Sequence, residues 1–369
     1  MPPITLLIKP ASSACNLSCS YCFYKDVAAH RNHAFEGILS LDMMEKVIAS
    51  GMEFADHSCT FAFQGGEPTL AGLDFYRKVL ELQQRYQKAG VEIRNTIQTN
   101  GMLIDEDWAR FFAENHFLIG LSLDGPAEIH NLNRMDLQQK GSFNAVMKAV
   151  RLFRNYHADF NILCVLTKRS AKAVEKVFRF YQKEDFRWIQ FIPCLDPFDM
   201  PEKKMAYSLT VDDYAFFLVK IFDLWFEEFQ KGNYISIRHL DNWLSIMLGN
   251  PPEACSMVGQ CSPQFVIEGD GSIYPCDFYV LDEWNLGTAG SRTFAEIADS
   301  QKAKDFVSIS KVIPPSCKEC RWYPICRNGC RRERDGDGLN IYCEAVRHFF
   351  TARYGQMQRA VQMVRWNNR

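Results

Sequence analysis

Short apolar runs alternate along the chain with longer stretches in which apolar residues recur every three or four positions. The short runs are typical of buried strands, and the longer stretches are typical of helices with one apolar face. The runs predict six strands: Thr5–Lys9, Cys59–Phe63, Glu92–Gln98, Leu118–Leu123, Asn161–Leu166 and Trp188–Ile192. The periodic stretches predict six helices: Leu41–Phe54 with Ser40 as N-cap, Asp74–Lys88, Glu106–Asn115, Phe143–Tyr156, Ala171–Lys183 and Val211–Gln230.

The repeated order of strand and helix predicts an α/β fold with a parallel sheet. Six such units are too few to close an eight-stranded barrel, so we expect a partial (β/α)6 TIM-like barrel. The polar stretch Asp196–Ser208, which contains Pro201, predicts a loop. After about residue 232 the helical signals are short, and Gly, Pro and cysteine are frequent. We therefore predict a barrel over residues 1–232 and a cysteine-rich module folded around metal over 233–369.

Composition and charge indicate which partners and which cell compartment to expect for this protein. The 369 residues carry a formal net charge of −2, which gives no electrostatic reason to expect nucleic acid or an anionic membrane as a partner. The apolar run Ile4–Ile8 is too short for a signal peptide, and no stretch approaches a membrane span. We expect a cytoplasmic protein from an anaerobic or low-oxygen host. Thiols stay reduced in the cytoplasm, which favours metal binding or catalysis over disulfides.

Eleven of the fourteen cysteines fall into two groups whose spacing suits iron–sulfur clusters. Cys15, Cys19 and Cys22 form a CxxxCxxC triplet in the loop after the first strand. The second group consists of Cys255, Cys261, Cys276, Cys317, Cys320, Cys326, Cys330 and Cys343. Three plus eight thiolates predict three 4Fe–4S clusters, of which one keeps an iron without a protein ligand.

Other interpretations of the cysteines remain open at this point. The triplet alone also fits a zinc knuckle without its fourth ligand, or reactive surface thiols. The downstream group also fits two zinc sites, because CxxC pairs with four thiolates suit zinc equally well. The three remaining cysteines lie within or at the end of apolar strand runs, where we expect buried, inert thiols: Cys59, Cys164 and Cys194.

The segment ACNLSCSYCFY resembles the cluster motif of radical S-adenosylmethionine (SAM) enzymes, with Tyr21 at its aromatic position. The sequence Gly65-Gly66-Glu67-Pro68 after the second strand resembles the GGEP motif of that family, which contacts the amino group of SAM. By the same resemblance, further SAM contacts are expected at Ser122, Asp124, Arg134 and Leu195. An arginine suits a carboxylate through its forked donors, although an isolated arginine is more often a solvated surface residue.

The resemblance also implies a mechanism. SAM binds the open iron through its amino and carboxylate groups, and one electron cleaves it to methionine and a 5′-deoxyadenosyl radical. That radical removes a hydrogen atom from an unactivated carbon. The cofactor supplies the difficult chemistry, and the protein supplies positioning and exclusion of side reactions.

The downstream cysteines resemble the signature of SPASM domains, which extend radical SAM enzymes that modify peptides and proteins. The matching pattern is Cys261-x9-Gly271-x4-Cys276, then Cys317-x2-Cys320-x5-Cys326-x3-Cys330, then Cys343. The resemblance implies two auxiliary 4Fe–4S clusters. The nearer would be held by Cys255, Cys261, Cys276 and Cys330, and the farther by Cys317, Cys320, Cys326 and Cys343.

Within this group the chain most resembles the anaerobic sulfatase-maturating enzymes, notably at Pro275-Cys276-Asp277. That resemblance implies oxidation of a cysteine or serine in a sulfatase polypeptide to Cα-formylglycine, with an electron donor such as ferredoxin or flavodoxin. It also implies that Asp277 is the catalytic base, whereas an aspartate in a loop is ordinarily a turn residue. Tyr24 and Gln64 are candidate substrate contacts, with ordinary packing as the alternative.

Two other functions fit parts of the sequence. Another SPASM peptide maturase would form thioether or carbon–carbon crosslinks on a precursor peptide. Such enzymes often carry an N-terminal precursor-binding domain, and because the triplet begins at Cys15 we expect none here. A non-catalytic iron–sulfur electron carrier would explain the cysteines but not the SAM-like loops after strands two to four.

Overall fold

The computed structural model describes residues 3–199 and 205–367 and divides them into two compact units that interleave along the chain. The first unit comprises residues up to 122, residues 131–160 and residues 262–307. The second comprises residues 123–130, 161–261 and 308 onward. Because segments 123–130 and 161–232 share a unit with the residues after 308, the predicted boundary after residue 232 stays a prediction.

The first unit contains a sheet in the order β4-β3-β2-β1-β8-β9. Its strands are β1 (Ile4–Ile8), β2 (Ser58–Phe63), β3 (Glu92–Thr99), β4 (Leu118–Ser122), β8 (Val266–Ile267) and β9 (Ile273–Tyr274). All neighbours are parallel except β8 and β9. Its helices are α1 (Phe23–Ala29), α2 (Leu41–Phe54), α3 (Leu73–Arg85), α4 (Glu106–Glu114), α6 (Phe143–Tyr156), α11 (Phe294–Asp299) and α12 (Gln301–Ser310).

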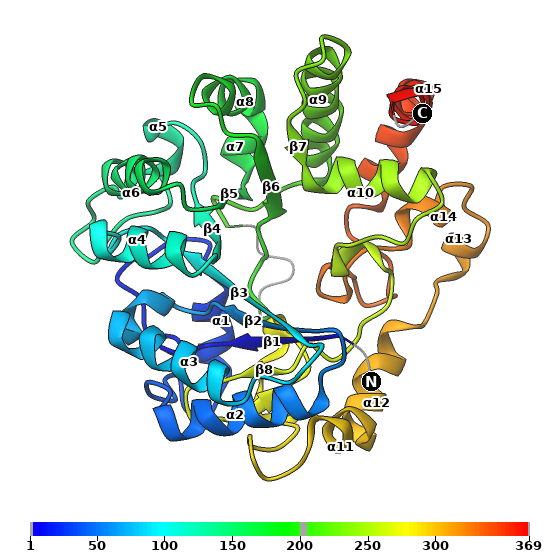
Figure 1. The fold of residues 1–369 in the computed structure, drawn as a ribbon. Helices are drawn as coiled ribbons and strands as arrows, with labels where there is room; N and C mark the ends of the chain where they lie inside the picture. The colour runs from blue at the N-terminus through cyan, green and yellow to red at the C-terminus, as the bar shows by residue number, and fades with distance from the viewer. Residues whose placement is uncertain (1–2, 200–204, 368–369) are drawn as a thin grey trace. The chain divides into compact units, whose positions relative to one another are not determined.

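Figure 1 shows α2, α3 and α4 on the same side of β1, β2 and β3. The apolar faces of these helices meet the strands in a core that is rich in aromatic rings, including Phe63, Tyr76 and Trp108. The predicted cap of α2 is confirmed, because the Ser40 hydroxyl accepts a hydrogen bond from Met43 N at 3.2 Å. The motif loops begin at the carboxyl ends of these strands, and this packing holds those ends in place.

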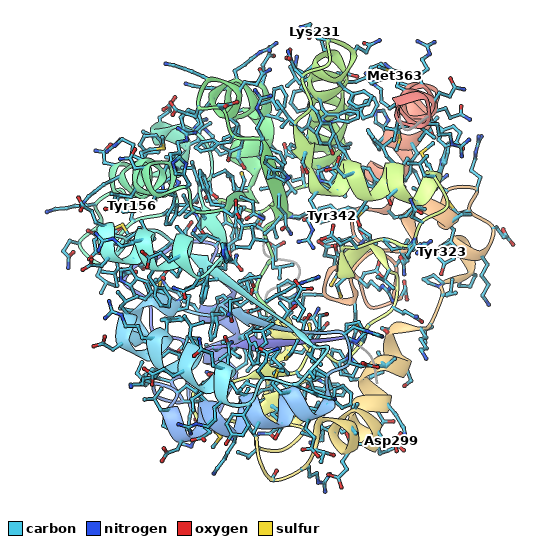
Figure 2. All side chains as sticks on the ribbon, viewed as in Figure 1. Tyr156, Lys231, Asp299, Tyr323, Tyr342 and Met363 are labelled. Carbon is cyan, nitrogen blue, oxygen red and sulfur yellow. The ribbon has the colours of Figure 1, made fainter. Side chains whose placement is uncertain are left out.

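The second unit contains the parallel strands β5 (Phe160–Leu166), β6 (Trp188–Pro193) and β7 (Ser236–Ile237). Its helices are α5 (Ala127–His130), α7 (Lys168–Lys172), α8 (Val174–Lys183), α9 (Val211–Gln230), α10 (Arg238–Met247), α13 (Pro315–Lys318), α14 (Tyr323–Cys326) and α15 (Cys343–Asn367). Figure 2 labels Lys231, just after α9, and Tyr342, just before α15.

The six predicted strands and the order of strand and helix are confirmed, with ends within one residue for the strands. Three details differ. The predicted helix Ala171–Lys183 is two helices, because Ala173 leaves helical geometry between them. The strands β7, β8 and β9 were not predicted. Residues 200–204 of the predicted Asp196–Ser208 loop lie outside the described residues.

The expectation of only short helices after residue 232 is wrong. The helix α15 has 25 residues, and it packs against α9 and α10 through Phe349, which contacts Phe222 and Trp243. Its buried positions recur every three or four residues at Val346, Phe349 and Phe350, Met357, and Ala360 and Val361. The frequent arginines and Gly355 obscured that period in the sequence.

Candidate functional site

The cysteine triplet lies in the loop between β1 and α1, with Cys22 as the N-cap of α1. The Cys15 sulfur accepts hydrogen bonds from Leu17 N at 3.4 Å and from Asn100 Nδ2 at 3.7 Å. Burial raises the pKa of the Cys15 thiol to about 12, and the nearby Cys19 and Cys22 thiols contribute to the rise. Such thiols lose their protons when metal binds, and three from one loop fit three irons of a 4Fe–4S cluster.

The backbone of the loop after β2 contacts the backbone of the triplet loop. Gly65 and Gly66 have φ of +88° and +47°, which favours glycine. A Cβ on Gly66 would lie 2.1 Å from the carbonyl oxygen of Ala14, immediately before the triplet, and Glu67 N donates to the same oxygen at 2.8 Å. Glycine at 66 is therefore required for this approach of the two backbones.

The Glu67 side chain ties the loop after β2 to the loop after β3. It is buried and accepts hydrogen bonds from Thr69, from Thr99 Oγ1 at 2.7 Å and from Asn100 N at 2.7 Å. Burial raises the pKa of this carboxyl, and the hydrogen bonds oppose the rise. Its Oε1 is thus occupied by three protein donors, while Oε2 accepts one hydrogen bond.

The predicted SAM contacts at the end of β4 are buried. Arg134 is 7% exposed, and its guanidinium carbon lies 5.5 Å from the ring centroid of Tyr21, which is consistent with a cation–π contact. Ser122 is also buried. In the second unit, Asp124 Oδ1 accepts a hydrogen bond from Val165 N at 2.9 Å, and Leu195 is half-buried after Cys194. Arg134 is therefore not the solvated surface residue of the alternative interpretation.

Asp277 is brought together with both predicted substrate contacts. Its Oδ2 accepts hydrogen bonds from Tyr24 Oη at 2.7 Å and from Gln64 Nε2 at 2.9 Å. The side chain is buried, and its Oδ1 has no hydrogen-bond partner among the described residues. Burial raises the pKa of this carboxyl, against the opposing attraction of Lys9. Asp277 is therefore more than a surface turn residue, because its side chain points into a polar site.

Sequence reasoning missed a buried charge cluster beside this aspartate. Lys9 follows β1, and its ammonium group is paired with the carboxylate of Glu268, to which Arg31 Nη1 also donates at 2.8 Å. The available signal was a lysine at the carboxyl end of a strand whose other residues are mostly buried and apolar. At that edge of a parallel sheet, a polar side chain is more often functional than structural.

The downstream cysteines of the second unit gather in two sets. Burial, with smaller contributions from Cys343, Cys317 and Cys320, raises the pKa of Cys326 to about 11. Burial, with smaller contributions from Glu333, Cys255 and Cys261, raises the pKa of Cys330 to about 12. Each set lies close enough for its thiols to influence one another, as ligands of one cluster must. Cys276 belongs to the first unit, and the ligand sets themselves stay predictions.

The three cysteines outside these groups are buried, as expected for inert thiols. Cys59 and Cys164 lie within β2 and β5, and Cys194 directly follows β6. In the described part of the chain, no helix is both long enough and apolar enough to cross a membrane.

Comparisons with known proteins agree with these sites. Residues 10–181 match the radical SAM superfamily, and residues 255–321 match the SPASM iron-sulfur cluster-binding domain. The SPASM match favours iron–sulfur over zinc for the downstream cysteines.

The similarity to individual relatives extends over almost the whole chain. The cysteine-type anaerobic sulfatase-maturating enzyme of Clostridium novyi is 47% identical over 95% of this chain and 95% of its own length. The serine-type enzyme of Bacteroides thetaiotaomicron is 31% identical over 94% of this chain and 89% of its own length. The solved structure of native anSMEcpe with bound AdoMet and Cp18Cys peptide has a TM-score of 0.94 and 45% identity, covering 98% of this chain and 100% of that chain.

These findings confirm the partial α/β barrel with a C-terminal SPASM domain, and with it SAM and 4Fe–4S clusters as cofactors. They exclude the non-catalytic electron carrier, because the relatives are enzymes across the same length. The crosslinking peptide maturase has no such support, because the relatives at 30% identity or more are named as sulfatase-maturating enzymes. The SuiB structure bound to precursor peptide SuiA matches at 16% identity and shows the fold alone. The chain belongs to the anaerobic sulfatase-maturating enzymes, a family of radical SAM enzymes with a SPASM domain.

Proposed function

We propose that this chain oxidises a cysteine side chain of a sulfatase polypeptide to Cα-formylglycine, and that Asp277 accepts the proton that the substrate releases. The geometry of the Asp277 carboxylate carries the proposal. Tyr24 and Gln64 hold one oxygen, while the other is buried and lacks a partner in the described part of the chain. A buried acceptor with one oxygen fixed and one available suits a substrate S–H group.

The cofactors are assigned to residues of this chain by the same proposal. The triplet cysteines would hold the cluster that binds SAM, and the two downstream sets, with Cys276, would hold the auxiliary clusters. Candidate SAM contacts are Tyr21, Gly65, Gly66, Glu67, Ser122, Asp124, Arg134 and Leu195. When bound, SAM and the clusters supply the 5′-deoxyadenosyl radical and one-electron acceptance.

The atoms and electrons of the oxidation balance. Asp277 accepts the proton of the substrate thiol. The bound SAM would supply the acceptor for one hydrogen atom from the substrate Cβ, and an iron–sulfur cluster would accept the remaining electron. The substrate CH₂–SH group becomes CH=S, which water converts to an aldehyde with release of hydrogen sulfide. The protein's part is to orient the thiol, hold its proton and exclude bulk water.

Cysteine is the favoured substrate residue. The relatives named as cysteine-type are 47% identical to this chain, whereas those named as serine-type are 30 to 31% identical, with the Bacteroides enzyme at 31%. A one-electron donor such as ferredoxin or flavodoxin would complete the cycle, and the cytoplasm, where thiols and clusters stay reduced, is the matching compartment.

Mass spectrometry of a CxPxR peptide after anaerobic incubation with SAM and a reductant tests the proposal. Replacement of CH₂SH by CHO lowers the peptide mass by about 18 Da, as counting the atoms of the proposed reaction requires. A matched SxPxR peptide would lose about 2 Da by the same count. An unchanged mass for both peptides, with 5′-deoxyadenosine still produced, would contradict the proposed substrate.

A further inference from the structure

The buried ammonium group of Lys9 lies at the centre of the Asp277 site. Lys9 is 1% exposed and is paired with Glu268, which is fully buried. Glu268 is shared, because Arg31 Nη1 also donates to it at 2.8 Å. Glu268 thus contacts both cations, and Glu36 is a further carboxylate near Arg31.

Lys9 also contacts the residues that hold Asp277. Its Nζ lies 5.0 Å from the ring centroid of Tyr24, whose hydroxyl donates to Asp277 Oδ2 at 2.7 Å. The stem of Lys9 packs against Gly65, where a Cβ would lie 2.6 Å from Lys9 Cγ and Cε. Gly65 directly follows Gln64, the second donor to Asp277 Oδ2. Lys9 is therefore enclosed between the charge cluster, the Tyr24 ring and the loop that carries Gln64.

Lys9 and Glu268 form the buried ion pair that lies beside the Tyr24 ring. Burial raises the pKa of Glu268, but Lys9 and Arg31 outweigh it and bring that pKa to about 2, so Glu268 is ionised. The Tyr24 hydroxyl joins this pair to Asp277 through its hydrogen bond to Asp277 Oδ2. Removing Lys9 would leave Asp277 without its nearby buried cation.

We propose that Lys9 is a positioning residue for the oxidation, which holds the Tyr24 ring against Asp277 and supplies the positive charge that the Asp277 carboxylate faces. This inference rests on the proposed function. It assigns to Lys9 no contact with the substrate, and it predicts that loss of Lys9 impairs the step after hydrogen abstraction more than SAM cleavage.

The test compares Lys9→Met with Arg31→Met in the holoenzyme. Each variant removes one of the two cations of Glu268, but only Lys9 lies against Tyr24. The readout is formylglycine formed per 5′-deoxyadenosine released. We expect this ratio to fall about tenfold in Lys9→Met, since a buried cation–π contact and its charge are worth about that factor. We expect Arg31→Met to lower the ratio less than Lys9→Met does, because only Lys9 lies against Tyr24, and to lower the melting temperature.

A double-mutant cycle with Tyr24→Phe separates positioning from general structural damage. If Lys9 acts through Tyr24 and its hydrogen bond to Asp277, adding Lys9→Met to Tyr24→Phe lowers the ratio by less than about threefold. Iron content and visible spectra of each variant check that the clusters are retained. If Lys9→Met fails to fold, Lys9→Gln, which keeps a hydrogen bond to Glu268 without the charge, takes its place.

Three results would overturn the inference: equal ratios for Lys9→Met and Arg31→Met, fully additive effects with Tyr24→Phe, or a wild-type ratio in Lys9→Met. These outcomes differ from failure of the proposed function. If the proposed function failed, the wild-type enzyme itself would release 5′-deoxyadenosine without forming formylglycine.

Discussion

At the scale of single residues, Asp277→Asn separates proton transfer from radical formation. Asparagine keeps the size of the side chain and can still accept a hydrogen bond from Tyr24, but it cannot take a proton. We expect clusters and SAM cleavage to be retained while aldehyde formation falls at least about 100-fold, the usual worth of a general base. Peptide mass spectrometry together with 5′-deoxyadenosine assays measures both quantities. Asp282→Asn, at a nearby exposed aspartate, serves as the matched control.

Full product yield in Asp277→Asn would remove this carboxylate from the mechanism. Loss of yield in Asp282→Asn to the same degree would show that the effect reflects damage to the segment as a whole.

A second residue-scale prediction concerns the triplet. Cys15→Ala removes one of three thiols from the loop after β1, and we expect no detectable SAM cleavage. Cys59→Ala, inside β2, removes a buried thiol that has no assigned ligand role, and we expect cleavage to continue with a stability loss of about 1 kcal/mol. Anaerobic release of 5′-deoxyadenosine distinguishes the two. Cleavage that survives in Cys15→Ala would refute the assignment of the triplet.

Some of these single residues could be identified from the sequence and others could not, depending on the residue type. Cysteines carry a spacing signal, so the triplet could be found directly. Asp277 could be singled out only through the family resemblance, because nothing in an isolated loop aspartate predicts that it is buried between Tyr24 and Gln64. Glu268 and Arg31 could not be found, since the pairing joins positions 237 residues apart along the chain.

At the scale of elements, the contact between the loops after β1 and β2 sets a strict size limit. Gly66→Ala would place a Cβ 2.1 Å from the Ala14 carbonyl oxygen, and backbone at that site cannot yield as a flexible side chain can. We expect loss of most of the triplet iron and of SAM binding. Gly72→Ala is the matched control, because Gly72 also has a positive φ, of +81°, but has open space around it. Both variants carry backbone strain, because both glycines have a positive φ.

Iron analysis and equilibrium binding of SAM measure the difference between these glycine variants. Equal iron content and equal SAM affinity in Gly66→Ala and Gly72→Ala would contradict this prediction. Either the two loops would not be in contact, or their contact would have no consequence for the cofactor.

Another element-scale prediction concerns the loops that carry the downstream cysteines. The Arg334 guanidinium donates to the carbonyl oxygens of Ser310, Gly259, Gly329 and Asn328, at 2.7 to 3.2 Å. Lysine cannot reproduce this fork of donors. We expect Arg334→Lys to lose auxiliary iron while the triplet cluster stays. Arg359→Lys, exposed on α15, should keep all iron. Loss of iron from both variants alike would contradict the role of Arg334.

The elements themselves were predicted to different degrees for a physical reason. The strands β1 to β6 have five to eight residues each, long enough for an apolar run or an apolar–polar alternation to be located in the sequence. The strands β7, β8 and β9 have two residues each, too few for any pattern. The helix α15 does have a helical period, but long arginine side chains and Gly355 interrupt it, and only the packing of Phe349 against α9 and α10 reveals it.

At the scale of the whole molecule, the metal clusters are expected to contribute to folding as well as to catalysis. Ligand sets that join distant segments convert metal affinity into folding free energy. We expect anaerobic removal of iron to lower the melting temperature measurably and to abolish SAM cleavage. Iron and sulfide should restore both. Zinc is the control metal, and it should restore no cleavage. An unchanged melting temperature after complete iron removal would show that the fold does not depend on the clusters.

The pairing of β8 with β1 has a consequence for biosynthesis. Leu7 lies opposite Val266, so the segment that delivers Asp277 joins its sheet only after more than two thirds of the polypeptide has left the ribosome. A chain that ends before Val266 would contain the amino-terminal thiols but not Asp277, the proposed proton acceptor. We expect such a fragment to form no aldehyde, so late completion of the sheet ties product formation to the intact protein.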